Sequence, residues 1–229
     1  MKISEYIHSL TKFEKGLWLV SVLVITVSFL VSGGSDFLSL TASLIGVTSL
    51  IFIAKGYIIG QVLMVVFSLF YGIISFFFSY YGEMITYLGM TAPMAVMSMI
   101  SWIKHPYKKT KEVEVAKVTK AQIGVMLLLT VIVTAAFYFI LRALGNANLI
   151  ISTISVTTSF IAAYLTFLRS EYYALGYASN DIVLIILWIL AAVSDISCLP
   201  MVLCFVMFLF NDLYGFYSWR KMRKRQTVS

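Results

Sequence analysis

Charged residues are scarce in this sequence: Asp, Glu, Lys and Arg make up 12% of 229 residues. Soluble domains carry about 25% charged and roughly 45–50% apolar residues. Here 61% of the residues are hydrophobic, and the mean hydropathy is +0.95. A water-soluble fold cannot bury this much apolar side chain. The composition therefore excludes a soluble domain and predicts a protein that lies in lipid.

Residues that carry chemistry are also few, with two cysteines and two histidines. Cys198 and Cys204 lie six apart in one apolar run, which suits neither a CxxC motif nor a short disulfide, so we expect core residues. Neither a metal-ligand cluster nor a glycine-rich phosphate loop is present in the sequence. We therefore expect no cofactor, no metal and no enzymatic activity, and we expect no cleaved signal peptide.

Long apolar runs are what the sequence does contain. A transmembrane helix needs about 20 mostly apolar residues. The membrane β-barrel pattern of short alternating segments is absent, so we predict an all-α polytopic protein. Eight candidate spans are predicted, at about 16–33, 37–54, 57–79, 84–103, 121–144, 149–168, 172–192 and 196–217.

The basic residues give these spans a direction. If the N-terminus is cytoplasmic, every Lys and Arg except Arg142 falls on the cytoplasmic side. This is the positive-inside pattern, and it accounts for the net charge of +7 without nucleic acid. We expect a multi-pass protein of the inner or plasma membrane with both termini in the cytoplasm. The basic residues near the C-terminus are expected to contact anionic lipid headgroups.

An internal repeat is indicated by two pairs of span ends. Ser101-Trp102-Ile-Lys104 ends the fourth span, and Ser218-Trp219-Arg-Lys221 ends the eighth. Lys55 and Arg169 likewise end the second and sixth spans. An even number of spans separates the copies, so they share one orientation, as in parallel-repeat transporters.

The predicted organisation follows from this repeat. The segments are an amphipathic N-terminus (1–15), an extra transmembrane helix (16–33), a first three-helix repeat (37–103), a basic cytoplasmic loop (104–120), a linker helix (121–144), a second three-helix repeat (149–219) and a basic cytoplasmic tail (220–229).

An Asn-Asp pair interrupts the seventh span at Asn180 and Asp181. An ionised Asp at a helix centre costs about 2.5–3.5 kcal/mol on insertion scales, so Asp181 should face the protein interior or a water-filled cavity. Tyr173, Tyr177 and Trp188 recur on that side at helical spacing. These residues predict a binding site for a flat, hydrogen-bonding solute. Helix pairing and proton coupling are alternative roles for Asp181.

The first repeat offers a counterpart to this stripe. Tyr87 and Thr91 lie on one face of the fourth span, and Pro93 predicts a bend beside them. Gln61 on the third span completes the candidate binding set.

A second Asn-Asp pair, Asn211 and Asp212, lies nearer the cytoplasmic end of the eighth span. It is a candidate inner gate, with helix pairing as the alternative. The two aspartates also suggest an intramembrane aspartyl protease as an alternative function. The YD and GxGD sequence contexts that such a protease uses are missing.

A family resemblance rests on several of these residues. The motifs YGEMITY and SWIKH, and the series Arg169, Asn180-Asp181, Trp188, Asp212-Leu-Tyr-Gly215 and Trp219, resemble the PnuC family of vitamin and nucleoside transporters. The resemblance covers spans two to eight. It implies a SWEET-like three-plus-one-plus-three arrangement with an extra N-terminal helix, a homotrimer, facilitated diffusion, and trapping of the substrate by a cytoplasmic kinase.

The family's sites carry over in part. Its binding asparagine falls on Asn180, its tryptophan-rich stretch reads Tyr173 to Tyr177 here, and its glutamine falls on Tyr87. Asp181 stands where an apolar residue is usual. A carboxylate there accepts hydrogen bonds from amino or imino groups, which favours a nucleoside, a deoxynucleoside or a cationic vitamin ring. Nicotinamide riboside remains the leading named substrate because the family resemblance favours it.

Other functions stay open at this point. The substrate could be another B vitamin, thiamine or riboflavin, or a sugar carried in the manner of SWEET proteins. A membrane scaffold or receptor without transport is the alternative from another class, and it would tolerate the substitution Asn180→Leu.

Overall fold

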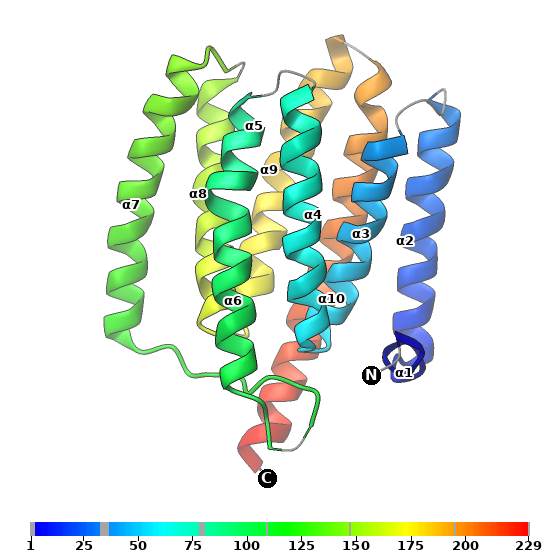
Figure 1. Ribbon diagram of the computed structural model, residues 1–229, viewed down its shortest axis with the longest axis vertical. Helices are drawn as coiled ribbons and strands as arrows, with labels where there is room; N and C mark the ends of the chain where they lie inside the picture. Colours follow the sequence, from blue (N-terminus) through cyan, green and yellow to red (C-terminus); the bar gives the residue numbers. More distant parts are fainter. Residues whose placement is uncertain are drawn as a thin grey trace.

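A computed structural model describes residues 3–32, 37–77, 81–108, 110–146, 148–194 and 196–228, leaving aside the side chains of residues 3, 4, 74, 75, 194 and 197. In this part of the chain regular structure is helical, apart from two isolated β-bridges (Figure 1). The elements are α1 (Ile3–His8), α2 (Lys12–Val31), α3 (Phe37–Ala54), α4 (Ile58–Phe77), α5 (Tyr81–Thr86), η1 (Tyr87–Thr91), α6 (Ala92–Lys104), α7 (Lys120–Ala143), α8 (Leu149–Phe167), α9 (Tyr173–Ser194), η2 (Ile196–Cys198) and α10 (Leu199–Val228).

Seven helical segments are long and apolar enough to cross a membrane: α2, α3, α5 to α6 taken together, α7, α8, α9 and α10. The apolar stretch of α4, Ile58–Ile73, is shorter. The long helices run side by side along the long axis of the molecule (Figure 1). The predicted all-α polytopic membrane fold is confirmed, and the count of eight spans stays a prediction.

Two of the differences from the predicted helix boundaries have a clear structural basis. The α2 helix begins at Lys12, because Thr11 and Glu14 form a capping box in which each side chain accepts from the other's backbone N–H, at 3.2 and 2.6 Å. The α10 helix runs without a break to Val228, so the helix continues through the basic residues after 219, and their cytoplasmic location stays a prediction.

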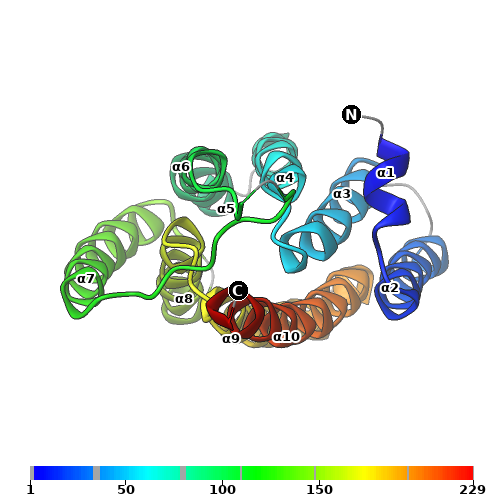
Figure 2. The ribbon, with the colours of Figure 1, turned by 90° about the horizontal axis from the view of Figure 1, so that it is seen from below.

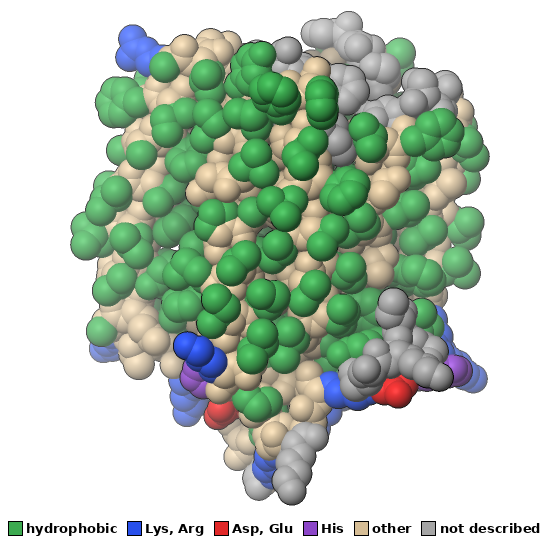
Figure 3. All heavy atoms as spheres, in the orientation of Figure 1, with side chains coloured by type: hydrophobic (Ala, Val, Ile, Leu, Met, Phe, Trp, Pro, Cys, Tyr) green, Lys and Arg blue, Asp and Glu red, His purple; other side chains and the backbone are tan. Residues whose placement is uncertain are grey.

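The outer surface suits a lipid environment. Hydrophobic side chains cover the visible face along the helices, and Lys and Arg side chains gather at the end that holds the termini (Figure 3). The α7 helix lies at one edge of the bundle (Figure 2) and exposes Leu128, Val131 and Phe139. Large exposed apolar patches mark membrane or protein contact surfaces, and seven spanning helices favour the membrane here.

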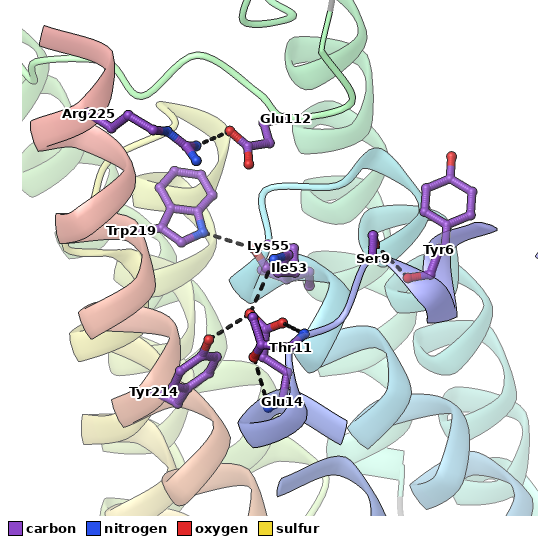
Figure 4. Close-up of polar contacts among 10 residues, drawn as sticks. All are labelled: Tyr6, Ser9, Thr11, Glu14, Ile53, Lys55, Glu112, Tyr214, Trp219 and Arg225. Atoms are coloured by element: carbon purple, nitrogen blue, oxygen red, sulfur yellow. Dashed lines mark hydrogen bonds and ion pairs between the residues drawn. The ribbon is translucent and has the colours of Figure 1, made fainter. Parts of the chain in front are cut away.

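Two fully buried tryptophans close the bundle at the end that holds the termini. Trp102 of α6 donates its indole N–H to the carbonyl of Thr166 on α8, with an N···O distance of 3.0 Å. Trp219 of α10 donates to the carbonyl of Ile53 on α3 at 2.8 Å (Figure 4). The two ring centroids are 5.3 Å apart. The third helix of each predicted repeat is thus bonded to the first helix of the other.

The ends of α3 and α8 are built alike. Gly56 and Arg169 follow these helices with left-handed φ angles of 68° and 58°. A left-handed residue after a helix lets the chain turn sharply while backbone N–H groups still satisfy the last carbonyls. The connection from α6 to α7 crosses both ends: Val113 donates its N–H to the Gly56 carbonyl at 2.9 Å, and Ala116 donates to the Arg169 carbonyl at 3.0 Å.

The end of α10 covers this connection. The Gln226 side chain donates to the Val113 carbonyl at 3.0 Å and accepts from the Val115 N–H at 2.8 Å. Arg225 forms an ion pair with Glu112 of the same connection (Figure 4). Seen from below, the connection runs across the bundle beside the C-terminus (Figure 2). The two indoles, the connection from α6 to α7 and the end of α10 together form what we call the closed end of the bundle.

A buried carboxylate fixes the additional helix α2 to this end. Glu14 is 2% exposed and accepts from the Tyr214 hydroxyl of α10 at 2.6 Å. The ammonium of Lys55 lies 3.4 Å from the same carboxylate oxygen (Figure 4). Since a buried charge is tolerated only when it is paired and hydrogen-bonded, these contacts determine where α2 packs.

Candidate functional site

A cavity of about 350 Å³ lies between α4, α5, η1, α7, α8, α9 and α10, within the size range of small-molecule sites. Its polar and aromatic lining comprises Tyr71, Tyr81, Glu83, Thr86, Tyr87, Thr91, Asn146, Asn148, Ser152, Ser155, Ser159, Asn180 and Trp188. Tyr81 begins α5 and Asn148 precedes α8, so the cavity extends to the end of the bundle away from the termini (Figure 1).

Asn180 of α9 is held by the hydroxyl-rich helix beside it. Its carbonyl oxygen accepts from Ser155 at 3.1 Å and from Thr158 at 2.9 Å, both on α8. Among the described residues, no group accepts from its amide nitrogen. The packing thus fixes the orientation of the amide and leaves its two N–H donors for a molecule in the cavity. This candidate site residue lies where the sequence predicted it.

Tyr87 and Thr91 also line the cavity, on a turn of π-helix that they delimit. Pro93 follows this turn; proline lacks an N–H, and its ring clashes with the carbonyl four residues earlier. The sequence predicted a bend at Pro93, and the departure from α-helix lies in the preceding turn. Such π-helical turns occur frequently at functional sites.

Trp188 is the other α9 residue of the predicted stripe that lines the cavity. Its indole nitrogen is buried without an acceptor in the described part of the chain. Leu184 lies between Trp188 and Asn180 on the same helical face and lines the cavity as well. An indole ring and an amide two turns apart thus lie along one wall.

Asp181 lies outside the cavity lining, although its chain neighbour Asn180 lines it. Successive residues in an α-helix are about 100° apart, which turns Asp181 toward α10. There its carboxyl contacts that of Asp212, and each residue is 3% exposed. No ion pair in the described chain involves either residue, and Oδ2 of Asp181 has no hydrogen-bond partner. Two carboxyl groups form a hydrogen bond only when one carries a proton.

The remaining predicted binding residues also lie away from the cavity lining. Tyr173 is 1% exposed and packs on Trp219, with ring centroids 4.8 Å apart, so it belongs to the closed end. Tyr177 lies beside Tyr173 at a centroid distance of 6.3 Å. Gln61 of α4 is 1% exposed, and its amide nitrogen has no acceptor among the described groups.

The two residues predicted as a gate point to different neighbours. Asn211 donates its amide N–H to the Ser21 hydroxyl of α2 at 2.9 Å and to the Met207 carbonyl at 2.8 Å. It therefore joins α10 to the additional helix. Asp212 faces Asp181 instead. A gating role for either residue stays a prediction.

Sequence reasoning missed Glu83, which lines the cavity together with Tyr71. The Tyr71 hydroxyl donates to the Glu83 carboxylate. Glu83 precedes the apolar run predicted for the fourth span, so hydropathy does not place it in that helix. The helix begins earlier, at Tyr81. The clustered hydroxyls of residues 152–159 were the available signal for the α8 wall.

Comparisons with known proteins agree on one family. A family model described as "Nicotinamide mononucleotide transporter" matches residues 36–221. A nicotinamide riboside transporter PnuC from Neisseria mucosa is 30% identical over 223 residues, covering 95% of this chain and 84% of that protein. The Haemophilus influenzae protein of the same name is 24% identical over 224 residues, covering 96% and 95%. The crystal structure of the vitamin B3 transporter PnuC matches with a TM-score of 0.80 at 27% identity, covering 95% and 94%.

Proposed function

Because this chain belongs to the nicotinamide mononucleotide transporter family of PnuC proteins, we propose that it carries a nucleoside-like small molecule across the membrane. Nicotinamide riboside is the first candidate, and nucleosides and deoxynucleosides are the next. The observation that carries the proposal is the polar cavity inside an apolar helix bundle, with Asn180 fixed at its wall. Thiamine and riboflavin are the alternatives among B vitamins.

The chemistry of the cavity suits such a solute. The Asn180 amide offers two N–H donors to a carboxamide or nucleobase carbonyl. Tyr87 and Trp188 line the cavity and provide aromatic rings for stacking. The α8 hydroxyls of Ser152 and Ser159 provide donors and acceptors for a ribose. A few placed polar groups in an otherwise apolar pocket are typical of ligand sites.

Transport is proposed to proceed by alternating access of two three-helix units, 37–103 and 149–219, arranged as in SWEET proteins. Three observations support this. The cavity extends to one end of the bundle, the other end is closed, and the closed end is held by matching Trp102 and Trp219 bonds between the units. The Lys and Arg distribution favours a cytoplasmic location for the closed end and both termini. The described conformation then faces outward.

We propose that transport requires no energy input. The substrate moves by facilitated diffusion, and a cytoplasmic kinase traps it by phosphorylation. A homotrimer is the proposed assembly, and the exposed side chains of α7 and α2 are surfaces for lipid or subunit contact.

A binding panel tests the substrate class. The purified protein is melted with nicotinamide riboside, thiamine, riboflavin, and the common nucleosides and deoxynucleosides. A ligand at 100 times its Kd that binds only the folded form adds about 2.7 kcal/mol of stability. If none of these compounds raises the melting temperature, the proposed substrate class is wrong.

Uptake by proteoliposomes tests the site. We expect Asn180→Leu to abolish uptake of the compound that binds while the protein still folds. Ser179→Leu is the matched control, because Ser179 is exposed and bonds only to the Leu175 carbonyl. A scaffold or receptor would not take up the compound in any variant, and a variant Asn180→Leu with unchanged uptake would refute the role of this cavity.

A further inference from the structure

One side chain of the described cavity lining carries a carboxyl group. Among the described residues that line the cavity, Glu83 is the only acidic side chain, and none of them is a Lys, Arg or His. The other polar lining groups are hydroxyls, amides and an indole. Inside a protein a charge acts through a lower effective dielectric than in water, so a single carboxylate strongly favours a cation in the same cavity.

The Glu83 carboxylate is held in place from one side. The Tyr71 hydroxyl donates to it, and Tyr71 is 8% exposed, so this donor is fixed by packing. An ionised carboxylate offers about four lone-pair sites, and one hydroxyl satisfies one of them. Glu83 therefore keeps capacity for a charged partner while Tyr71 determines its orientation.

Aromatic rings surround the approach to this carboxylate. Tyr71 and Tyr87 are in contact, with ring centroids 4.4 Å apart, and both line the cavity. Tyr81 and Trp188 line it as well. Aromatic faces attract cations through the ring quadrupole, and sites for quaternary nitrogen are built from such rings. A carboxylate among aromatic rings is thus suited to a flat ring that carries a positive charge.

We propose that Glu83 is a specificity-determining residue that recognises the positively charged ring of the substrate. This rests on the proposed function and deepens it. The pyridinium ring of nicotinamide riboside carries a permanent positive charge, whereas nucleosides, riboflavin and reduced nicotinamide riboside have neutral rings. Glu83 selects the charged ring, and Asn180 binds a polar group of the same substrate from the α9 side.

Reduced nicotinamide riboside is the matched ligand, since its dihydropyridine ring has nearly the same shape without the charge. Binding of both compounds is measured by calorimetry with the purified protein and with Glu83→Gln, Glu83→Asp and the surface control Glu5→Gln. We expect the unchanged protein and Glu5→Gln to prefer the cation. Glu83→Gln should weaken cation binding about tenfold or more and leave the neutral compound nearly unchanged, and Glu83→Asp should recover part of the loss.

The outcomes separate this inference from the proposed function. Equal weakening of both compounds in Glu83→Gln, or no preference in the unchanged protein, overturns the role of Glu83 and indicates a purely structural bond to Tyr71. Binding of neutral nucleosides but not of nicotinamide riboside overturns it too, while the transporter proposal stands. If no compound of either panel binds, both are overturned.

Discussion

The indole hydrogen bonds of Trp102 and Trp219, each made to the other three-helix unit, allow the stability of the closed end to be predicted. Trp102→Phe and Trp219→Phe each keep an aromatic ring and remove one N–H donor. The acceptor carbonyls are not orphaned, because the Ile53 carbonyl still accepts from Gly56 N–H at 2.8 Å and the Thr166 carbonyl from Arg169 N–H at 3.0 Å. Each substitution removes the net value of one hydrogen bond, about 1 kcal/mol, and also the packing of the larger, fully buried indole, so this figure is a lower bound.

If the closed end separates during transport, the lost stabilisation affects the closed conformation alone. One substitution then lowers the ratio of closed to open molecules at least about fivefold, and both together lower it at least about 30-fold, since 1.4 kcal/mol is a factor of ten. The equivalent positions of the two indoles predict that the single substitutions act in the same direction with similar size.

Electron spin resonance distances measure this ratio. Spin labels at Ile103→Cys and Tyr217→Cys report on the closed end, since both positions are exposed and neither forms a described hydrogen bond. Cys198 and Cys204 are replaced by alanine in this background. A longer distance population should grow in each Trp→Phe variant and most in the double variant. Unchanged distance distributions in all three would refute the idea that the indole bonds oppose opening.

Three further predictions concern the helix contacts. Asp181→Asn should raise the melting temperature by a few degrees, because an amide donates to Asp212 without requiring a shared proton; a lower value would contradict the described contact. Asn211→Leu should cost about 1–3 kcal/mol in chemical unfolding, since it breaks the bond to Ser21 and leaves that buried hydroxyl without this partner, whereas Leu213→Ala on the exposed face should cost little. Gly176→Ala should lower the melting temperature, because its Cβ would lie 2.9 Å from the Ala162 Cα; Gly124→Ala on α7, with no atom within 4 Å, is the control.

Hydropathy and charge predicted the all-α membrane architecture because each can be summed over the consecutive residues of a segment, without knowledge of tertiary contacts. Apolar runs located the helices, and the scarcity of acids and bases within them placed the ends. The last boundary was missed because the run Arg220 to Arg225 is typical of a solvated tail. In the structure its side chains pair with other segments, as Arg225 does with Glu112, and the helix continues to Val228.

The site was predictable where one polar residue stands out in an apolar helix. Asn180 was found in this way, and the hydroxyls of α8 that hold it were visible as a Ser and Thr run. Asp181 was assigned to the same pocket because it is adjacent in sequence. Which of two neighbouring residues faces a cavity depends on the rotation of the helix against α8 and α10, and no single-helix pattern contains that rotation.

The π-helical turn at Tyr87–Thr91 has a consequence for the register of its helix. It holds about one residue more than an α-helical turn, so everything before it is rotated by roughly 100° relative to α6. Deleting Gly89 would restore the common winding and swing Tyr87 and Glu83 off the cavity wall, without altering any side chain that lines it. Which side chains face the cavity therefore depends on the number of residues along this helix as well as on their identity.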